Sequence, residues 1–189
     1  MNRIYLCGAC NVGKSAIARE SVELCPETLV ARIDVSETAF GPVFGAGLGT
    51  TLRWRKWVGQ APKVYQAVME YIDLLGEKPE PGKSLVYNEG PAQLLAHLIY
   101  FGCLHDLRPV WRVEVIERSP GLLDVGTHVL VYGWGHDDPL NAATVPFQHA
   151  LLAGRENAVL LGQARGYRET VTDGVAAVRD AATDRKRVQ

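Results

Sequence analysis

Hydrophobic residues along the chain form two alternating patterns. Short apolar runs bounded by turn residues predict strands, which we place at residues 3–7, 28–34, 84–91, 127–134 and 158–161. Apolar residues at helical spacing predict helices between them, which we place at residues 14–24, 63–75, 91–104 and 139–152. A last helix is predicted to be capped by Asp173 and to run to residue 182.

One further stretch, Val110 to Glu117, alternates apolar and polar residues and predicts a half-buried strand. Its link to the strand at 127–134 is short for a crossover helix, so the two are expected to form an antiparallel pair or to be joined by a single turn. Together, the alternating strands and helices predict an α/β fold, a three-layer sandwich with a mainly parallel sheet and helices on both faces.

Composition adds limits to this picture. The 189 residues fit a single domain, 1–189, and 47% hydrophobic and 22% charged residues are typical of soluble globular chains. A formal net charge of -1 indicates neither a nucleic-acid nor a membrane partner. With four cysteines, no signal peptide and no membrane-length apolar stretch, we expect a cytoplasmic protein. The sequence indicates no oligomeric state.

The stretch "CGACNVGKSA", from Cys7 to Ala16, carries the clearest chemistry. Residues Gly8 to Ser15 match G-x-x-x-x-G-K-[ST] at every fixed position, between a predicted strand and a predicted helix. The two glycines let the backbone approach a phosphate, toward which amides at a helix N-terminus would point. Zinc knuckles and redox pairs also use C-x-x-C. A zinc knuckle needs a second pair of ligands, which is missing here. A thioredoxin-like pair places its first cysteine at a helix N-terminus, whereas Cys7 ends a strand. We therefore expect Cys7 to pack as a small hydrophobe.

This stretch resembles the phosphate loop of the P-loop NTPase superfamily, and the specific resemblance ends near residue 25. It implies a P-loop NTPase type of fold that binds ATP and Mg²⁺. Lys14 would reach the β- and γ-phosphates and take part in catalysis, and Ser15 would be a metal ligand. The residues expected to hold the triphosphate are Gly8, Ala9, Cys10, Asn11, Val12, Gly13, Lys14, Ser15 and Ala16.

The string Asn-Val-Gly-Lys-Ser at 11–15 is also typical of small GTPases. That branch recognises guanine through an Asn-Lys-x-Asp loop, and none of the asparagines in this chain precedes a lysine. Asp124-Val125-Gly126 also has the wrong spacing for a D-x-x-G switch. The chain therefore looks more like the nucleoside and nucleotide kinases of the P-loop class.

Acids at the ends of predicted strands are candidates to align an acceptor hydroxyl or a metal ion. Asp34 ends the second predicted strand and Glu37 follows it. Nucleoside-kinase-like relatives place a base here, although Asp34 would also suit a turn cap. Glu89 follows the strand at 84–91 and would suit either catalysis or helix capping. Glu117 is its rival, and the neighbouring Arg118 is a candidate substrate ligand.

A second distinctive stretch comprises Arg53, Trp54, Arg55, Lys56 and Trp57. Tryptophans interleaved with cations would stack a base and clamp a phosphate, or grip single-stranded nucleic acid. They would equally suit a helix start with buried tryptophans. The glycine-rich residues before them favour a substrate loop at 40–60.

P-loop kinases often bring arginines from a lid, and a lid-like segment is predicted at 136–170. It contains Arg155, Arg165 and Arg168 but lacks the dense arginine helix of nucleotide monophosphate kinases. We therefore expect an ATP-dependent phosphotransferase that acts on a nucleoside, a nucleotide or a related small hydroxyl compound. Nucleic acid is a less favoured acceptor, but the stretch at 53–57 keeps open a hydroxymethylated base within DNA, as in the phage-type DNA-modifying kinases that the chain would then resemble. The alternative is an ATPase or GTPase switch module that acts on a protein or nucleic-acid partner.

Overall fold

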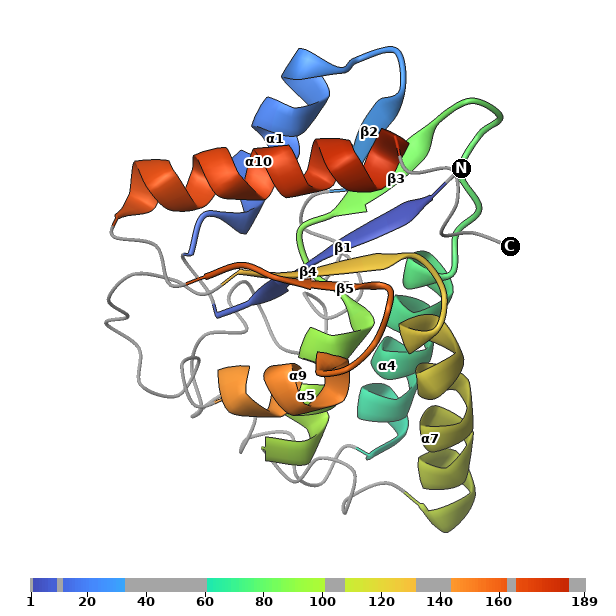
Figure 1. The fold of residues 1–189 in the computed structure, drawn as a ribbon. Coiled ribbons are helices and arrows are strands. Elements are labelled where there is room, and N and C mark those ends of the chain that lie inside the picture. Colours follow the sequence, from blue (N-terminus) through green and yellow to red (C-terminus); the bar gives the residue numbers. More distant parts are fainter. Residues whose placement is uncertain are drawn as a thin grey trace.

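A single parallel sheet organises the part of the chain that the structure describes. The computed structural model describes residues 2–9, 12–32, 61–100, 108–131, 144–162 and 166–183 (Figure 1). The strands in these ranges are β1 (Arg3–Gly8), β2 (Leu29–Arg32), β3 (Ser84–Tyr87), β4 (Thr127–Val131) and β5 (Ala158–Leu160). They pair in the order β2-β3-β1-β4-β5, and every pairing is parallel. The predicted α/β fold with a mainly parallel sheet is thus confirmed for the described residues.

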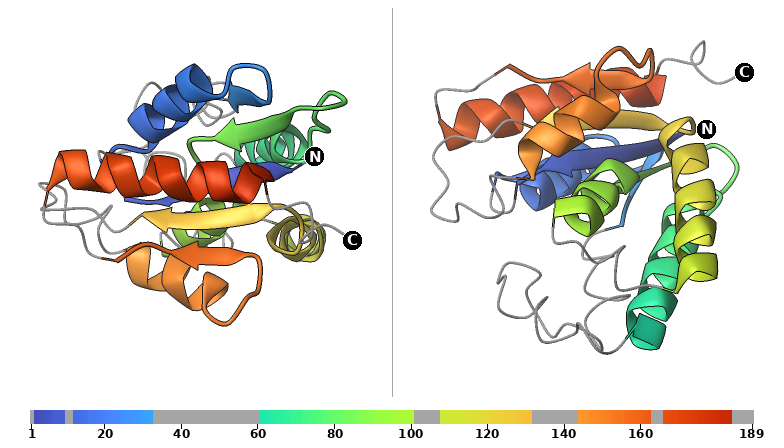
Figure 2. Two further views of the ribbon diagram at one scale, coloured as in Figure 1. Left: turned by 45° about the horizontal axis from the view of Figure 1, so that its top comes forward. Right: turned by 90° about the horizontal axis from the view of Figure 1, so that it is seen from below.

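Helices cover both faces of the sheet (Figure 2). On one face, α1 (Lys14–Leu24) and α10 (Tyr167–Thr183) share a core with the side chains of Ile4 and Leu6. On the other face, a second core surrounds Tyr5 and Cys7. The helices of this second face are α4 (Ala61–Leu75), α5 (Pro91–Tyr100), α7 (Pro109–Leu123) and α9 (Val145–Leu152). The arrangement has three layers, helices, sheet and helices.

The central strand β1 is apolar on both sides because both of its faces are covered. Successive side chains of a strand point to opposite faces, so Ile4 and Leu6 enter one core while Tyr5 and Cys7 enter the other. All four side chains are fully buried. The loop that follows β1 therefore starts from a rigid, central position at the carboxyl ends of the strands.

The stretch from Val110 to Glu117 is a helix, so the strand predicted there is wrong, as is its antiparallel pairing with 127–134. These residues belong to α7, which begins at Pro109. Proline is favoured at the first helical position because its missing N–H has no helical partner there. Trp111 and Val115 are four residues apart on one side of the helix and pack into the core, whereas Val110 and Val113 are 77% and 51% exposed. Packing in the helix thus uses only part of the apolar positions that had predicted a strand.

Other predicted elements occur with changed ends. The helix predicted at 63–75 begins two residues earlier, at Ala61, and Asp173 lies inside α10 rather than capping it, because α10 begins at Tyr167. The helix predicted at 139–152 is described from Val145 onward. Residues 33, 34, 101–104, 132–134 and 139–143 of the predicted elements lie outside the described residues.

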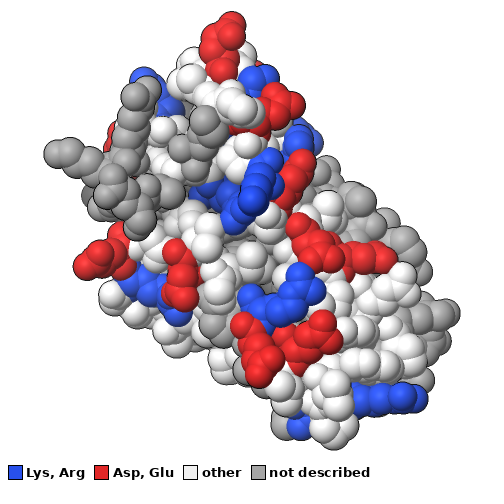
Figure 3. All heavy atoms as spheres, turned by 90° about the vertical axis from the view of Figure 1, so that its right-hand side faces the viewer, with Lys and Arg blue, Asp and Glu red and all other residues white. Residues whose placement is uncertain are grey.

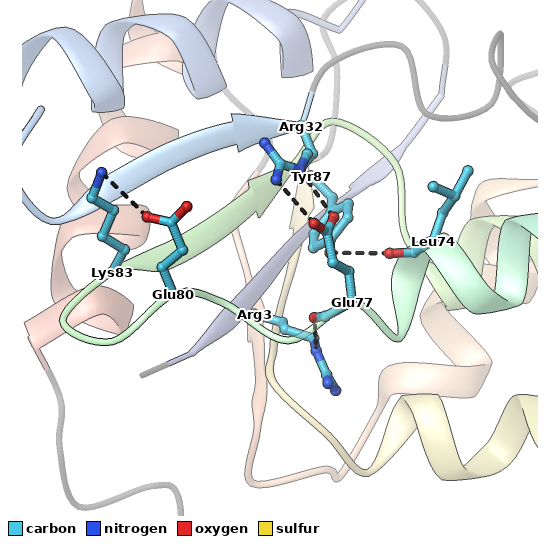
Figure 4. Close-up of polar contacts among 7 residues, drawn as sticks. All are labelled: Arg3, Arg32, Leu74, Glu77, Glu80, Lys83 and Tyr87. Atoms are coloured by element: carbon cyan, nitrogen blue, oxygen red, sulfur yellow. Dashed lines mark hydrogen bonds and ion pairs between the residues drawn. The ribbon is translucent and has the colours of Figure 1, made fainter.

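Three neighbouring strands anchor the C-terminal end of α4 (Figure 4). Arg3 of β1 donates to the carbonyl oxygen of Glu77 at 2.7 Å, and the Arg32 guanidinium of β2 pairs with the Glu77 carboxylate at 3.0 Å. Tyr87 of β3 donates to the carbonyl oxygen of Leu74 at 3.1 Å. These bonds fix how the last turns of α4 approach the sheet.

The surface that lies on the right in Figure 1 carries positive and negative side chains in close alternation (Figure 3). A mixed surface of this kind creates no extended field of one sign that would attract a polyanion. Within the described ranges, no helix has both the length and the apolar character needed to cross a membrane.

Candidate phosphate-binding site

The predicted phosphate loop lies where the connections from two adjacent strands diverge. β1 leads into α1 on one face of the sheet, while β3 leads into α5 on the other face. The turn after β3 passes close to β1, because a Cβ placed on Gly90 would lie 2.6 Å from the Cβ of Tyr5. In open parallel sheets, ligands bind in the crevice that such a divergence creates at the carboxyl ends of the strands.

Gly8 ends β1 in a conformation that requires glycine. Its φ is 131°, and a Cβ there would lie 2.4 Å from the carbonyl oxygen of Val131 on β4. Its amide donates to Oε1 of Gln148 on α9 at 2.7 Å, and Nε2 of Gln148 donates to the Thr144 hydroxyl at 3.2 Å. Gln148 is fully buried, so a side chain far away in sequence fixes the start of the loop.

Gly13 caps the N-terminus of α1 and ends the loop. Its φ is 98°, and no side chain caps the helix at this position. The amide of Ile17 donates to the Gly13 carbonyl at 2.9 Å, which starts the helical hydrogen-bond series. The earlier amides of Lys14, Ser15 and Ala16 have no partner within the helix, so they are suited to an anion.

Lys14 turns back over the loop. Its ammonium donates to the carbonyl oxygens of Gly8 and Ala9 at 3.2 Å and 2.5 Å, and its side chain is buried. A charged side chain is rarely buried without partners, and here its partners are loop carbonyls rather than a carboxylate. The cationic end of Lys14 is therefore held within the loop, where it would neutralise a bound anion.

Ser15 faces the end of β3. The side-chain amide of Asn88 donates to the Ser15 hydroxyl at 3.1 Å, and Asn88 is only 6% exposed. Asn88 and Glu89 are consecutive residues after β3, but Asn88 contacts α1 whereas Glu89 contacts α4. Glu89 accepts a hydrogen bond from the Tyr71 hydroxyl of α4 at 3.2 Å. Burial raises the pKa of Tyr71 well above its usual value, so this hydroxyl stays a donor.

Cys7 behaves as a small core residue, as predicted. Its side chain is fully buried, and burial raises the pKa of its thiol to about 12. A thiol with this pKa stays protonated at neutral pH and is a poor nucleophile and metal ligand. Among the residues described here, no group of three or more His, Cys, Asp and Glu side chains is arranged to hold a metal ion.

Several predicted site residues lie outside the described residues. They are Cys10, Asn11, Asp34, Glu37, Arg53, Trp54, Arg55 and Trp57, together with the predicted substrate loop at 40–60. The structure brings together Gly8, Ala9 and Lys14 of the loop, while Ser15 contacts Asn88, the residue that precedes Glu89 after β3. Val12 is buried beside Gly8 as part of the core.

Arg118 lies away from this site, so its predicted position at a strand end beside Glu117 is wrong. Both residues belong to α7, and Arg118 pairs with Asp73 of α4 at 2.5 Å. Asp73 and Tyr71 are two residues apart in a helix, so their side chains point about 160° apart, to nearly opposite sides of α4. Since Tyr71 contacts Glu89, the helix α4 separates Arg118 from that acid.

The predicted lid-like segment 136–170 is described in part. Within it, α9 packs against α5 and β5 extends the sheet. Arg155 pairs with Asp124 at 2.6 Å, and the two residues precede β5 and β4, respectively. Arg155 is therefore at the amino ends of the strands, opposite the predicted phosphate loop. Arg165 lies outside the described residues, and Arg168 is exposed in the first turn of α10.

Three polar residues at the site were not anticipated from the sequence, namely Tyr71, Asn88 and Gln148. Tyr71 occupies a position in the apolar stripe of a predicted helix, and Gln148 lies in a helix with a weak pattern. The sequence around them therefore gives no signal that either is a site residue. Asn88 directly precedes the predicted acid Glu89, and its position after a buried strand is the one signal that could have identified it.

Comparison with known proteins adds no relatives: no protein-family model matches the chain, and no curated protein matches it.

Proposed function

We propose that this protein is a phosphotransferase of the P-loop kinase type that uses ATP and Mg²⁺ to phosphorylate a small hydroxyl compound, a nucleoside or a nucleotide. The observation that carries the proposal is the arrangement of Lys14 and Ser15 at the first turn of α1. Lys14 reaches across the loop to Gly8 and Ala9, and Ser15 faces the end of β3. The loop joins the central strand to a helix N-terminus, which is where a triphosphate is expected to bind.

Positioning and charge supply most of the catalysis in phosphoryl transfer. The amides of the first turn of α1 would bind the β- and γ-phosphates, because they lack helical partners. Lys14 would exchange its bonds to the Gly8 and Ala9 carbonyls for phosphate oxygens and would neutralise charge as it develops on the moving group.

Mg²⁺ prefers oxygen ligands and is commonly bound by few protein groups together with substrate phosphates. The Ser15 hydroxyl is an oxygen ligand at the right end of the loop, so the residues present fit this ion. When bound, Mg²⁺ would neutralise charge on the β- and γ-phosphates.

Glu89 is the acid best placed to align the acceptor. It follows β3, next to the strand that leads into the loop, and it is partly exposed. The hydrogen bond from Tyr71 restrains its carboxylate, and a restrained carboxylate can orient a hydroxyl and accept its proton. Asp34 remains the alternative predicted base.

Nucleotide binding is the first test. Calorimetric titration with ATP and GTP, with and without Mg²⁺, should show binding of ATP. Lys14→Ala should weaken that binding about 10–100-fold, because one charge-assisted contact to phosphate is lost. Lys83→Ala is a matched control, since Lys83 contacts Glu80 on the surface, and it should bind as wild type does. Unchanged ATP affinity in Lys14→Ala would refute the loop assignment.

The acceptor is tested with labelled ATP and a panel of nucleosides, nucleotides and hydroxymethylated DNA. Transfer to a member of this panel, abolished or strongly slowed in Glu89→Gln, is the expected result. Transfer to water alone would favour the ATPase switch module instead.

A further inference from the structure

Asn88 occupies a position where an acid commonly helps a P-loop serine to hold Mg²⁺. In P-loop NTPases, an aspartate at a strand end shares the metal with the Ser or Thr of the loop. Here the residue that contacts the Ser15 hydroxyl is an amide. Asn88 is also fixed through its main chain, because its backbone amide donates to the carbonyl oxygen of Arg32 at 3.3 Å. Its side chain is therefore buried, held by β2 and directed at Ser15.

The acid next to it is directed elsewhere. Glu89 takes its hydrogen bond from Tyr71 on the α4 side of the turn, whereas Asn88 serves Ser15 on the α1 side. Within the described part of the chain, the Ser15 hydroxyl is thus hydrogen-bonded to a neutral amide, that of Asn88. The closest cation on the loop is Lys14, whose charge opposes the entry of a free divalent cation.

Hydrogen-bond chemistry explains what an amide does in this place. A serine hydroxyl has two lone pairs and one proton, and the Asn88 N–H occupies one lone pair. This contact orients the second lone pair without adding negative charge. A carboxylate would instead add charge close to the metal and attract it even without nucleotide.

We infer that Asn88 is a positioning residue that orients the Ser15 hydroxyl toward Mg²⁺ and, being neutral, makes metal binding depend on the phosphates of the nucleotide. The site takes a magnesium–nucleotide complex and has little affinity for free Mg²⁺. This inference rests on the proposed nucleotide site, but it concerns the coupling between metal and nucleotide rather than nucleotide binding itself.

The test measures ADP affinity by calorimetry in EDTA and in Mg²⁺, and Mn²⁺ binding by electron paramagnetic resonance without nucleotide. The proteins are wild type, Asn88→Ala, the isosteric Asn88→Asp, and Asn157→Ala as control. Asn157 donates to the Leu123 and Gly126 carbonyls at the amino ends of β4 and β5, whereas Ser15 and Asn88 lie at the carboxyl ends of the strands. Circular dichroism establishes that each variant is folded.

Wild type should bind ADP more tightly with Mg²⁺ and should bind Mn²⁺ only weakly without nucleotide. Asn88→Ala should reduce the gain from Mg²⁺ about tenfold while ADP affinity in EDTA stays within about twofold of wild type. Asn88→Asp should bind Mn²⁺ without nucleotide, at least about tenfold more tightly than wild type. Asn157→Ala should match wild type in both measurements.

The outcomes separate this inference from the proposed function. Suppose that ADP binds but Mg²⁺ raises the ADP affinity of all variants equally, or that Asn88→Asp binds Mn²⁺ no better than wild type. Asn88 then has no role in coupling metal binding to nucleotide binding. If wild type binds ADP neither in EDTA nor in Mg²⁺, the proposed nucleotide site itself is overturned, and this inference with it.

Discussion

His128 lies in the middle of β4 with no exposed surface, and its ring stacks on Tyr5 of β1 at a centroid distance of 5.1 Å. Its Nε2 lies 3.1 Å from the carbonyl oxygen of Leu123, while Nδ1 has no hydrogen-bond partner among the described residues. A protonated ring would therefore leave one N–H unsatisfied in the core, which is costly. Burial accordingly lowers the pKa of His128 to about 4.

This histidine should make the protein sensitive to acid. In the unfolded chain the imidazole titrates near its ordinary pKa of 6.5, so below that pH the unfolded state binds the proton first. Above pH 7 His128 is neutral in both states, so its protonation does not change the free energy of unfolding there. As the pH falls from 7 to 4, His128 should lower the free energy of unfolding by about 3 kcal/mol. Urea unfolding of wild type and His128→Gln between pH 4 and pH 7 measures this. If the free energy of unfolding changed equally with pH in the two proteins, the predicted effect of His128 would be contradicted.

Residue identity alone predicted the local structure around the glycine loop. Gly8, Gly13, Lys14 and Ser15 were expected at a strand-to-helix loop because the motif is local, and this local geometry is confirmed. The contact between Ser15 and Asn88 was not predictable in the same way. It joins residues 73 positions apart, and nothing in the pattern around either residue specifies the partner.

At the level of elements, α1 holds its place through close packing against α10. Gly174 lies inside α10, and a Cβ there would come within 2.4 Å of Cδ1, 2.8 Å of Cγ1 and 3.1 Å of Cγ2 of Ile17. Ile17 is fully buried, and its branched side chain has little freedom to turn away. The absence of a side chain at Gly174 therefore allows α1, the helix that follows the predicted phosphate loop, to approach α10.

Gly174→Ala should destabilise the protein by about 1–2 kcal/mol, because overpacking outweighs the gain in helix propensity. Gly121→Ala is the matched control: Gly121 also lies in a helix, but a Cβ there meets nothing within 4 Å. That change should stabilise by about 0.5–1 kcal/mol. Chemical denaturation of both variants, of Ile17→Ala and of Ile17→Ala/Gly174→Ala tests the packing, since Gly174→Ala should cost less stability in the Ile17→Ala background than in wild type. Stabilisation of Gly174→Ala would disprove it.

Helix α7 shows the limit of periodicity. Val110, Trp111, Val113 and Val115 fit a strand by alternation, yet packing needs only Trp111 and Val115, which share one side of a helix. Trp111 stacks on Tyr65 of α4 at 4.8 Å, and this contact exists only once α4 and α7 lie together. The alternation had predicted a strand, and the helix that forms instead is packed through a tertiary contact that the local pattern does not contain.

At the level of the whole molecule, the order of the strands separates two regions. The ends of β1 and β3 bring the loop, Asn88 and Glu89 together, whereas the Arg118–Asp73 pair lies on the other side of α4 from Glu89. Both members of that pair are exposed to solvent, Arg118 in part and Asp73 for the most part. Such pairs contribute little to stability because water screens them.

Arg118→Ala should therefore cost less than about 1 kcal/mol of stability and leave ATP affinity and turnover unchanged. Thermal or urea unfolding measures the stability, calorimetry measures the ATP affinity, and a phosphoryl-transfer assay measures the turnover. A loss of ATP affinity comparable to that of Lys14→Ala would mean that Arg118 reaches the bound nucleotide.

The sequence by itself determined the local units, the buried strand, the glycine loop and the helix with Lys14 and Ser15 at its start. These depend on neighbours in the chain, through backbone freedom at glycine and the burial of apolar residues at regular spacing. Only the tertiary structure decided the helical state of α7, the all-parallel strand order and the partners of Ser15 and Glu89. These depend on which faces are covered and which distant strand ends meet, and a local pattern carries neither piece of information.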